Sequence, residues 1–439
     1  MDYREAIAWL DDHINLEATR SPTRLVPPTL DRMRELVGLL AEPQHQYPVL
    51  HVTGTNGKTS AARFASRLLE AAGLAVGTYT SPHIETVTER LAWNGEAISE
   101  AAFAEVISEV AALTELMATP PSWFEIMTAA AFAWFADLPV SAAVVEVGLL
   151  GRWDATNVAD GSVAVITNVG LDHVDYAGSL ENIAREKAGI VKPGATLVLG
   201  ETDPDLLPIL EDVPAGAILR RGEDFEVLDR RLAHGGRLLT VRTPRAVYDQ
   251  VFLSVHGAFQ ADNAAIALAA VEAFVGRPLG ADLVEEAFAG APSPGRLEVM
   301  GHQPLVLLDG AHNPDGARAL AAAVVEEFAV PGRTIVVFGV LDPHDPAEIL
   351  DALRDLPADE VVACAPRSPR AVAADDVVAA ADDLGIPAEA APTVAAAVDR
   401  ALARAHDDDL VLVTGSLYTV GNARMALRAR GWGAGGRRA

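Results

Sequence analysis

Short apolar strand patterns alternate with helical patterns along almost the whole chain, and this alternation constrains the fold more than any other feature. The strand patterns are rich in β-branched residues, and the segments between them repeat apolar residues at helical spacing. Such alternation is typical of βαβ units on a mainly parallel sheet, so we predict an α/β fold. The predicted strands are 49–53, 75–80, 142–147, 163–168, 196–199, 305–308, 334–338, 361–364 and 410–414.

One loop in this pattern carries a charged motif where a strand ends and a helix begins. The loop between strand 49–53 and helix 59–72 reads Gly54, Thr55, Asn56, Gly57, Lys58, Thr59, Ser60. Glycines let backbone N–H groups converge on phosphate oxygens, the helix N-terminus adds partial positive charge, and the lysine neutralises further oxygens. We interpret the segment as a phosphate-binding loop, although its G-x-x-G-K-[ST] spacing is two residues shorter than usual. A plain helix start with tight turns is the alternative.

The length of 439 residues and one turn-rich joint predict two domains. The joint is the Ala-Pro-Ser-Pro-Gly segment at 291–295, of the kind found at domain boundaries. We expect a large phosphate-loop domain over 1–293 and a smaller Rossmann-like α/β domain over 294–430. A disordered tail is expected over 431–439. Further expected elements are helices 100–117, 124–135, 180–190, 263–274 and 282–288, and an antiparallel hairpin within 225–255 appended to the sheet.

The charge balance excludes several classes of partner. The chain has 34 basic and 61 acidic residues, a formal net charge of −27, which repels nucleic acid and anionic membranes. We therefore expect no nucleic-acid partner, and any anionic ligand needs a local site. Only three basic residues are lysines, namely Lys58, Lys187 and Lys192, and each is expected where a compact ammonium is needed.

Cysteine usage and hydropathy predict a cytoplasmic protein. The single cysteine, Cys364, cannot form an intramolecular disulfide, which is natural in a reducing compartment. The start of the chain lacks the basic-then-apolar pattern of a signal peptide. The most apolar window, 128–150, is interrupted by Asp137, Pro139 and Glu146, so we predict no membrane span. We also expect a monomer.

A series of short motifs follows the phosphate loop along the chain. They are Ser81-Pro82-His83, Glu146-Val147-Gly148, Gly151-Arg152-Trp153-Asp154-Ala155-Thr156-Asn157, Leu171-Asp172-His173, Glu186-Lys187-Ala188-Gly189-Ile190, Gln260 with Asn263-Ala264-Ala265, Gly295-Arg296, Asp309-Gly310-Ala311-His312-Asn313-Pro314 and Gly415-Ser416-Leu417-Tyr418. Together with the shortened loop, they resemble the folylpolyglutamate synthase / dihydrofolate synthase family of the Mur ligase superfamily. The resemblance covers about residues 49–421 and implies an ATP-dependent ligase that joins L-glutamate to a folate or to dihydropteroate. It also implies that the segment around 13–20 forms the pterin-binding loop.

Potential metal ligands follow several predicted strands, at the edge where open α/β sheets bind their ligands. Glu146 ends an apolar strand, Ser81 follows another, and His173 closely follows a third. For each of them, a turn former or a solvated polar group is the alternative. The resemblance implies two Mg²⁺ ions beside ATP, with Ser81 and Glu146 at one ion and His173 at the other.

Lys187 raises a charge problem, because two divalent cations would repel an ammonium. In the family that the chain resembles, the matching lysine is typically carbamylated, which replaces the positive charge by a negative group with two oxygens. The resemblance implies the same for Lys187, and it implies catalytic roles for Lys58, His173 and Arg296 as well. The alternative for Lys187 is an unmodified helix lysine paired with a carboxylate.

Further residues are implied in ATP binding by the resemblance. Asp309 and His312 lie between a strand and a helix of the second domain, and Arg296 lies just past the joint, where it would reach the phosphates on domain closure. A surface ion pair is the alternative for Arg296. Asn263 is a further candidate, with helix N-capping as its alternative. Asn313-Pro314 has the pattern of a helix start, so we assign it no chemistry.

The chemistry of amide formation explains why ATP is needed. A carboxylate does not react usefully with an amine at neutral pH, since its acyl carbon is electron-rich and oxide is a poor leaving group. Phosphorylation by ATP produces an acyl phosphate, which the neutral amine of glutamate then attacks. Two alternatives stay open: another Mur-type ligase that acts on a muropeptide or other acidic acceptor, and a regulatory ATPase without ligase activity.

Overall fold

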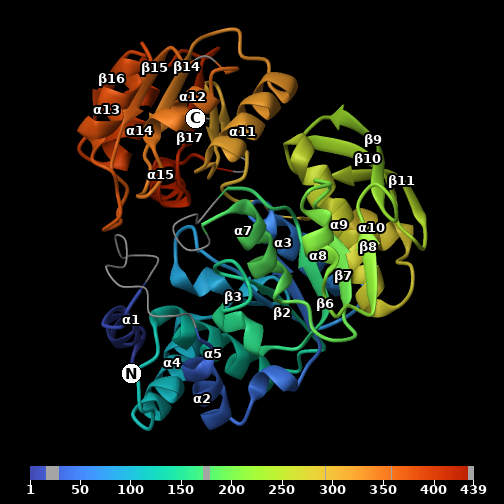
Figure 1. Ribbon diagram of the computed structural model, residues 1–439. Helices are drawn as coiled ribbons and strands as arrows, with labels where there is room; N and C mark the ends of the chain where they lie inside the picture. The colour runs from blue at the N-terminus through green and yellow to red at the C-terminus, as the bar shows by residue number, and fades with distance from the viewer. Residues whose placement is uncertain (16–28, 172–177, 292, 357, 434–439) are drawn as a thin grey trace.

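The computed structural model describes residues 1–15, 29–171, 178–291, 293–356 and 358–433. Their strands form an eight-stranded sheet, a six-stranded sheet and a three-stranded antiparallel sheet. Figure 1 shows the six-stranded sheet and its helices above the eight-stranded sheet, with the three-stranded sheet to one side. Each of the two large sheets is mixed but mainly parallel and has apolar clusters that pack helices against it. The predicted α/β fold is confirmed.

The eight-stranded sheet has the order β4-β3-β2-β5-β1-β6-β7-β8. Its strands are β1 (Val49–Thr53), β2 (Val76–Tyr79), β3 (Leu91–Trp93), β4 (Glu96–Ala97), β5 (Ala142–Glu146), β6 (Gly161–Ile166), β7 (Thr196–Leu199) and β8 (Ala217–Arg220). Six of them are parallel, whereas β3 and β4 form an antiparallel edge. Because β1 is flanked by β5 and β6, the loops that follow these three strands meet at one edge of the sheet.

Helices enclose this sheet in two apolar layers. One layer packs α3 (Lys58–Ala71), α9 (Ala258–Val275) and α10 (Ala281–Ala289). The other packs α1 (Tyr3–Asp11), α2 (Asp31–Leu39), α4 (Glu100–Thr114) and α5 (Trp123–Asp137). Two more helices, α7 (Leu180–Ala188) and α8 (Leu207–Glu211), share a smaller cluster with β6 and β7. Short 3₁₀ turns occur at η1 (Pro43–His45), η2 (Val87–Arg90) and η3 (Ala155–Val158).

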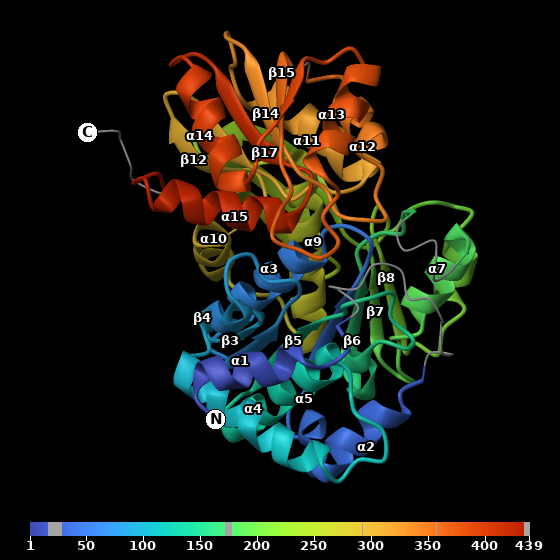
Figure 2. The ribbon, with the colours of Figure 1, turned by 90° about the vertical axis from the view of Figure 1, so that its left-hand side faces the viewer.

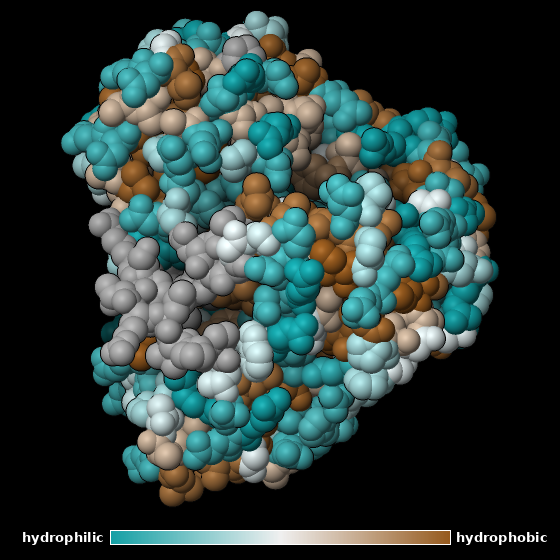
Figure 3. Space-filling model, viewed as in Figure 1, coloured by the Kyte–Doolittle hydropathy of each residue, from teal (hydrophilic) through white to brown (hydrophobic). Residues whose placement is uncertain are grey.

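Helix α9 is the one helix in the described part of the chain that is long and apolar enough to cross a membrane. Its most apolar window is 67% buried within the fold. Residues on all sides of α9 join the core, in agreement with a helix enclosed by protein rather than by lipid. Figure 3 shows that hydrophilic residues spread over one face of the molecule, where apolar residues form scattered groups.

The three-stranded sheet consists of β9 (Glu226–Ala233), β10 (Gly236–Arg242) and β11 (Val247–Leu253). The sequence predicted an antiparallel hairpin appended to the main sheet; the hairpin is confirmed as β9 and β10, but its attachment to the main sheet is wrong. A second turn at 243–246 adds a third strand, and the three strands form their own sheet. Apolar residues of β10 and β11 pack into the core around α9, so burial of one face separates this sheet from the parallel one.

The six-stranded sheet has the order β12-β13-β17-β14-β15-β16, with only β12 antiparallel to its neighbour. Its strands are β12 (Glu298–His302), β13 (Leu305–Leu308), β14 (Thr334–Phe338), β15 (Glu360–Ala363), β16 (Ala388–Ala390) and β17 (Leu410–Thr414). Its helices are α11 (Pro314–Glu327), α12 (Pro346–Ala352), α13 (Ala374–Asp383), α14 (Val394–Arg404) and α15 (Leu417–Arg428). Figure 2 shows α15 between this sheet and the α3 side of the larger unit.

A buried ion-pair cluster links the three-stranded sheet to the six-stranded unit. Arg237 of β10 donates to Glu327 of α11 at 2.5 Å and to Glu326 at 2.6 Å. Glu327 also accepts from Gly257 N at 2.7 Å and lies 2.8 Å from His256 Nδ1. The side chains of Arg237 and Glu327 are only 1% and 2% exposed, so this contact couples the two parts of the chain.

Several predicted boundaries differ from the structure. The helix predicted over 263–274 begins at Ala258, after Gly257 with a φ of 96°. Consequently Asn263 lies inside the helix, and its alternative role as an N-cap is wrong. The prediction omitted the short strands β3, β4, β8, β12 and β16, which lie at or near sheet edges. Of the tail predicted to be disordered, 434–439 lie outside the described residues, while Trp432 packs against Gly301.

Candidate active site

The phosphate-loop sequence forms the turn from β1 into α3. Gly57 precedes the first helical residue with a φ of 82°, a conformation that favours glycine. Among the described residues, no side chain caps the N-terminus of α3, so its first amides can serve a ligand. The ammonium of Lys58 turns back over the loop and donates to the carbonyls of Gly54 (2.8 Å) and Thr55 (3.1 Å). The geometry is that of an anion cradle.

Residues that follow β6 hold this loop in place. The Thr167 hydroxyl donates to Asn56 O at 2.6 Å, and the Asn168 side chain accepts from Asn56 N at 2.9 Å. A Cβ at Gly54 would lie 1.8 Å from Thr167 Oγ1, which explains why a residue with no side chain is needed there. Sequence reasoning missed Thr167 and Asn168, although their position at the end of a strand beside β1 is the signal that could have identified them.

Two asparagines approach the same loop from other elements. Asn263, on α9, lies so close that a Cβ at Gly57 would meet its side-chain oxygen at 2.3 Å. Asn313 caps α11 by accepting from Gly316 N at 2.8 Å, and Pro314 begins that helix, as the sequence predicted. The Asn313 side chain also reaches Asn56 at 3.4 Å, which joins the six-stranded unit to the phosphate loop. This second contact was not predicted.

Glu146 lies at the centre of the site, at the end of β5. Its carboxylate accepts from the Thr59 hydroxyl at 2.8 Å and from Ser81 N at 3.1 Å, and the residue is 1% exposed. Burial raises the pKa of Glu146, while Lys58, the two hydrogen bonds and Arg63 act in the opposite direction. The structure thus brings Lys58, Thr59, Ser81 and Glu146 together. Oxygen donors beside a cationic loop have the composition of a magnesium–phosphate site.

Lys187 is buried, with 3% exposure, on α7. The loop after β5 packs against this helix, because Arg152 N donates to Glu186 O at 2.8 Å and a Cβ at Gly151 would lie 3.2 Å from Lys187 Cα. That loop also contains Leu150, which has a positive φ of 58°. Lys187 therefore lies near the chain segment that leaves Glu146. His173 and the pterin-loop segment 16–20 lie outside the described residues.

The remaining predicted ligand residues come from the other sheet. Asp309, after β13, accepts from Leu297 N (2.9 Å) and Ala311 N (2.8 Å), and burial raises its pKa whereas Arg296 lowers it. The ring of His312 lies 5.3 Å from that of His344. Asp309 therefore holds the backbone at Leu297, the residue that follows Arg296.

Arg296 and an arginine that sequence reasoning missed, Arg63 of α3, line one small cavity. The cavity has a volume of about 10 Å³, and its other lining residues are Thr59, Ser60, Pro82, Ile84, Ser293, Pro294 and Leu417. Thr59 belongs to the phosphate loop, Pro82 follows Ser81, and Leu417 begins α15. The cavity therefore joins the phosphate loop, the loop that follows Ser81 and the six-stranded unit. Within the described chain, no three His, Cys, Asp or Glu side chains form a cluster suited to a metal.

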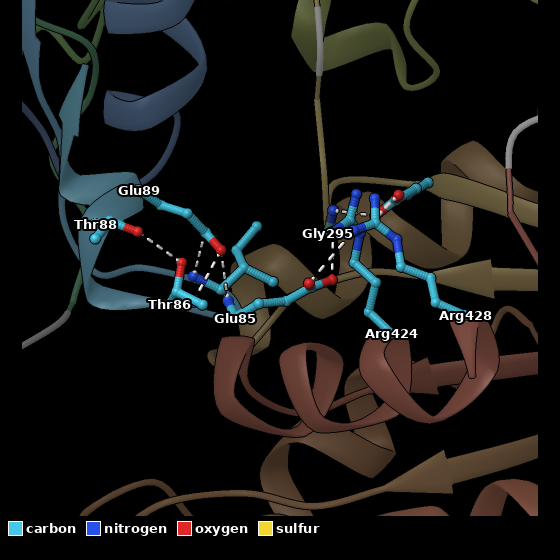
Figure 4. Close-up of polar contacts among 9 residues, drawn as sticks. Glu85, Thr86, Thr88, Glu89, Gly295, Arg424 and Arg428 are labelled. Atoms are coloured by element: carbon cyan, nitrogen blue, oxygen red, sulfur yellow. Dashed lines mark hydrogen bonds and ion pairs between the residues drawn. The ribbon is translucent and has the colours of Figure 1, made fainter. Parts of the chain in front are cut away.

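An ion-pair network closes the interface next to this cavity. Figure 4 shows Glu85, which follows the Ser81 loop, facing Arg424 and Arg428 of α15. Arg424 also pairs with Glu298 at 2.8 Å, and Glu298 accepts from Gly295 N at 2.8 Å. The network therefore connects the loop that follows Ser81, α15 and the joint that carries Arg296.

The Glu85 loop is itself braced by one carboxylate. Glu89 accepts from the backbone N–H groups of Ile84, Glu85 and Thr86 at 2.9–3.0 Å, as Figure 4 also shows. Three donors on one carboxylate hold the loop in a single conformation. Glu85 is thereby presented to α15 from a rigid support.

Two family models match the chain in the order expected for this architecture. The Mur ligase middle domain matches residues 52–271, and the Mur ligase glutamate ligase domain matches residues 295–417. The first match covers the phosphate loop, Glu146 and Asn263. The second covers Arg296, Asp309 and His312.

Similar proteins were found among curated sequences and among solved structures. The chain is 40% identical to dihydrofolate synthase/folylpolyglutamate synthase of Mycobacterium tuberculosis, over 92% of this chain and 91% of that protein. It is 32% identical to the Bacillus subtilis protein of the same name, over 97% of this chain and 99% of that protein. It superposes on M. tuberculosis folylpolyglutamate synthase complexed with ADP with a TM-score of 0.90, at 38% identity and coverage of 97% and 98%. It superposes on E. coli FolC in complex with DHPP and ADP with a TM-score of 0.86, at 30% identity over 97% of this chain and 98% of that one. The chain belongs to the folylpolyglutamate synthase/dihydrofolate synthase family of Mur ligases.

Proposed function

We propose that this chain uses ATP to join L-glutamate to a folate, and to dihydropteroate, through an acyl phosphate. The observation that carries the proposal is the convergence of Lys58, Glu146 and Arg296 around α3 at the interface of the two large sheets. Relatives support it by their ligands: E. coli FolC was solved with DHPP and ADP, and a bifunctional folylpolyglutamate synthase/dihydrofolate synthase with Mn, AMPPNP and L-glutamate.

The triphosphate would bind along the phosphate loop. The loop amides of 54–60 and the Lys58 ammonium meet the phosphate oxygens, and Lys58 exchanges its loop carbonyls for them. Asn263 supports the loop from α9. Asp309 and His312 would contact the nucleotide from the six-stranded unit, where Asp309 has two backbone partners that hold its orientation.

The donor set fits magnesium. Glu146 and Ser81 offer oxygens next to Lys58, and the buried Glu146 carboxylate accepts hydrogen bonds from Thr59 and from Ser81 N. We assign Glu146 and Ser81 to one ion and His173 to a second; bound Mg²⁺ would neutralise charge on the transferring phosphoryl group. We assign Lys187 as a carbamate, because two divalent cations at this site would repel a lysine ammonium and attract an anionic group with two oxygens.

The chain's own residues then act by position and charge. An oxygen of the acceptor carboxylate attacks the γ-phosphorus, the bond to the ADP oxygen breaks, and ADP leaves with the electron pair. Lys58 and Arg296 stabilise the developing negative charge. The glutamate amine attacks the acyl carbon next, the bond from that carbon to the phosphate oxygen breaks, and phosphate leaves with the electron pair while the nitrogen loses a proton to the phosphate or to water. Closure of the interface around the small cavity excludes the water that would hydrolyse the acyl phosphate.

A coupled assay of ADP release tests this proposal. We expect release only when both glutamate and a folate or dihydropteroate are supplied. Release with a muropeptide acceptor instead would favour another Mur ligase, and equal release without any acceptor would favour a regulatory ATPase.

Two further assignments accompany the proposal. We place the domain boundary between residues 293 and 294, supported by the start of the second family match at residue 295. We also propose a cytoplasmic monomer. Among the described residues Cys364 is a free, buried cysteine, so the fold does not depend on a disulfide there, which is compatible with a reducing compartment. Light scattering during size-exclusion chromatography tests the oligomeric state.

A further inference from the structure

Arg63 of α3 stands out among the arginines of this chain. Its guanidinium forms no hydrogen bond or ion pair with any residue that the structure describes, and the same holds for Arg296. Most other arginines in this acidic protein have such partners; for example, Arg67, one helical turn further along α3, donates to Glu70 at 2.8 Å. Two arginines without partners line a single cavity.

This arrangement is electrostatically unfavourable without a ligand. Burial lowers the pKa of Arg63; among the neighbouring charges Glu146 raises it most, Arg296 lowers it, Glu89 raises it and Arg424 lowers it. Because arginine stays charged at any physiological pH, the two cations repel one another at their present positions. An anion between them would offset the repulsion and supply hydrogen-bond acceptors to both guanidinium groups.

The position of Arg63 indicates which anion this would be. The phosphate loop and the first turn of α3, with Lys58 and Thr59, serve the nucleotide, and Thr59 reaches Glu146. Arg63 is four residues beyond Thr59, so it lies one turn further along the same face of α3. An acceptor must approach the γ-phosphate from the side away from ADP. Thr59, Arg63 and Arg296 line the same cavity, and we place the acceptor there.

We infer that Arg63 is an additional catalytic residue, which together with Arg296 binds the acceptor carboxylate and the acyl phosphate formed from it. This inference rests on the proposed function. The carboxylate oxygen forms a bond to the γ-phosphorus while the bond to ADP breaks, and the two guanidinium groups hold the remaining charge. The cavity of about 10 Å³ has room for about one water, so the acceptor enters only when the six-stranded unit moves away from α3.

The variants Arg63→Gln and Arg63→Lys test the inference, and Arg67→Gln is the matched control on the same helix. The assay omits glutamate and traps the acyl phosphate with hydroxylamine as a hydroxamate. We expect Arg63→Gln to reduce ATP- and folate-dependent hydroxamate formation by at least about 10-fold, with recovery in part by Arg63→Lys. Arg67→Gln should match the wild type. The dissociation constant for ATP should change by less than about twofold in each variant, which also reports that the phosphate loop is folded.

Two results would overturn the inference while leaving the proposed function intact. One is normal hydroxamate formation by Arg63→Gln with a raised KM for glutamate, since Arg63 would then hold the incoming amino acid. The other is wild-type behaviour of Arg63→Gln in every assay. If instead the wild-type protein forms no folate-dependent hydroxamate and releases no folate-dependent ADP, the proposed function fails, and the role of Arg63 fails with it.

Discussion

Truncation of Arg237 to methionine should destabilise the protein by about 3 kcal/mol. Arg237 donates to Glu327 through Nε at 3.1 Å and Nη2 at 2.5 Å, and both side chains are almost fully buried. Breaking a buried pair costs about 3–5 kcal/mol, because the remaining charge is left without compensation. The lower end applies here, since Glu327 keeps its contacts with His256 and with Gly257 N.

Equilibrium unfolding in urea, followed by tryptophan fluorescence, measures this loss. Arg231→Met is the matched control, because Arg231 pairs with Asp229 on the surface of β9, where both side chains are about half exposed. We expect the control to lose less than about 1 kcal/mol. The double variant Arg237→Met/Glu327→Gln should recover about 1–2 kcal/mol relative to Arg237→Met, as it no longer buries an unpaired charge. Equal losses for Arg237→Met and Arg231→Met would refute the reasoning.

Three further predictions concern pH, the interface and the nucleotide. Burial opposes ionisation of Glu327, but its hydrogen bonds outweigh that and lower its pKa, so the carboxylate stabilises the fold above the ordinary Glu pKa of 4.5, and this stabilisation is lost as pH falls through the lower folded value. Glu327→Gln should therefore be less stable than wild type at neutral pH, and its stability should fall less on acidification below pH 4.5. Urea unfolding of both proteins across this pH range measures the difference, and an equal pH dependence would contradict the prediction. Glu85→Gln should weaken closure of the interface by about 1–2 kcal/mol, seen as a larger radius of gyration in small-angle scattering, whereas Arg428→Gln, at a half-exposed position, should change it little. Lys58→Met should weaken ATP binding about 10- to 100-fold in calorimetry, and unchanged affinity would show that the loop does not hold the phosphates.

Much of the fold could be predicted because central parallel strands are short, apolar and flanked by helices. The bounds of β1, β7, β13, β14 and β17 agree with the prediction for this reason. Edge strands such as β4 and β16 carry no continuous apolar run, since one side of each lacks a neighbouring strand. Their pairing depends on tertiary position, which a local pattern does not contain.

In the candidate site, too, some residues could be predicted from local sequence and others depend on tertiary packing. Gly57 and Lys58 belong to a local motif, and the Asn313 cap follows from the adjacent pair Asn313-Pro314, so both could be predicted. Arg63 has no such signature, because its meaning depends on Arg296, more than two hundred residues away in the chain. The contact between Glu85 and Arg424 likewise depends on how the two units pack. The chemical roles of His173 and Lys187 stay predictions.

Isotope transfer provides the most direct test of the acyl phosphate. The acceptor is a folate in which both oxygens of the reacting carboxylate are ¹⁸O, and the enzyme turns over with unlabelled ATP and glutamate. Mass spectrometry of the released phosphate should find one ¹⁸O atom per phosphate, because a carboxylate oxygen becomes the bridge to phosphorus and leaves with it. Phosphate released without label, in amounts equal to the amide formed, would contradict the account.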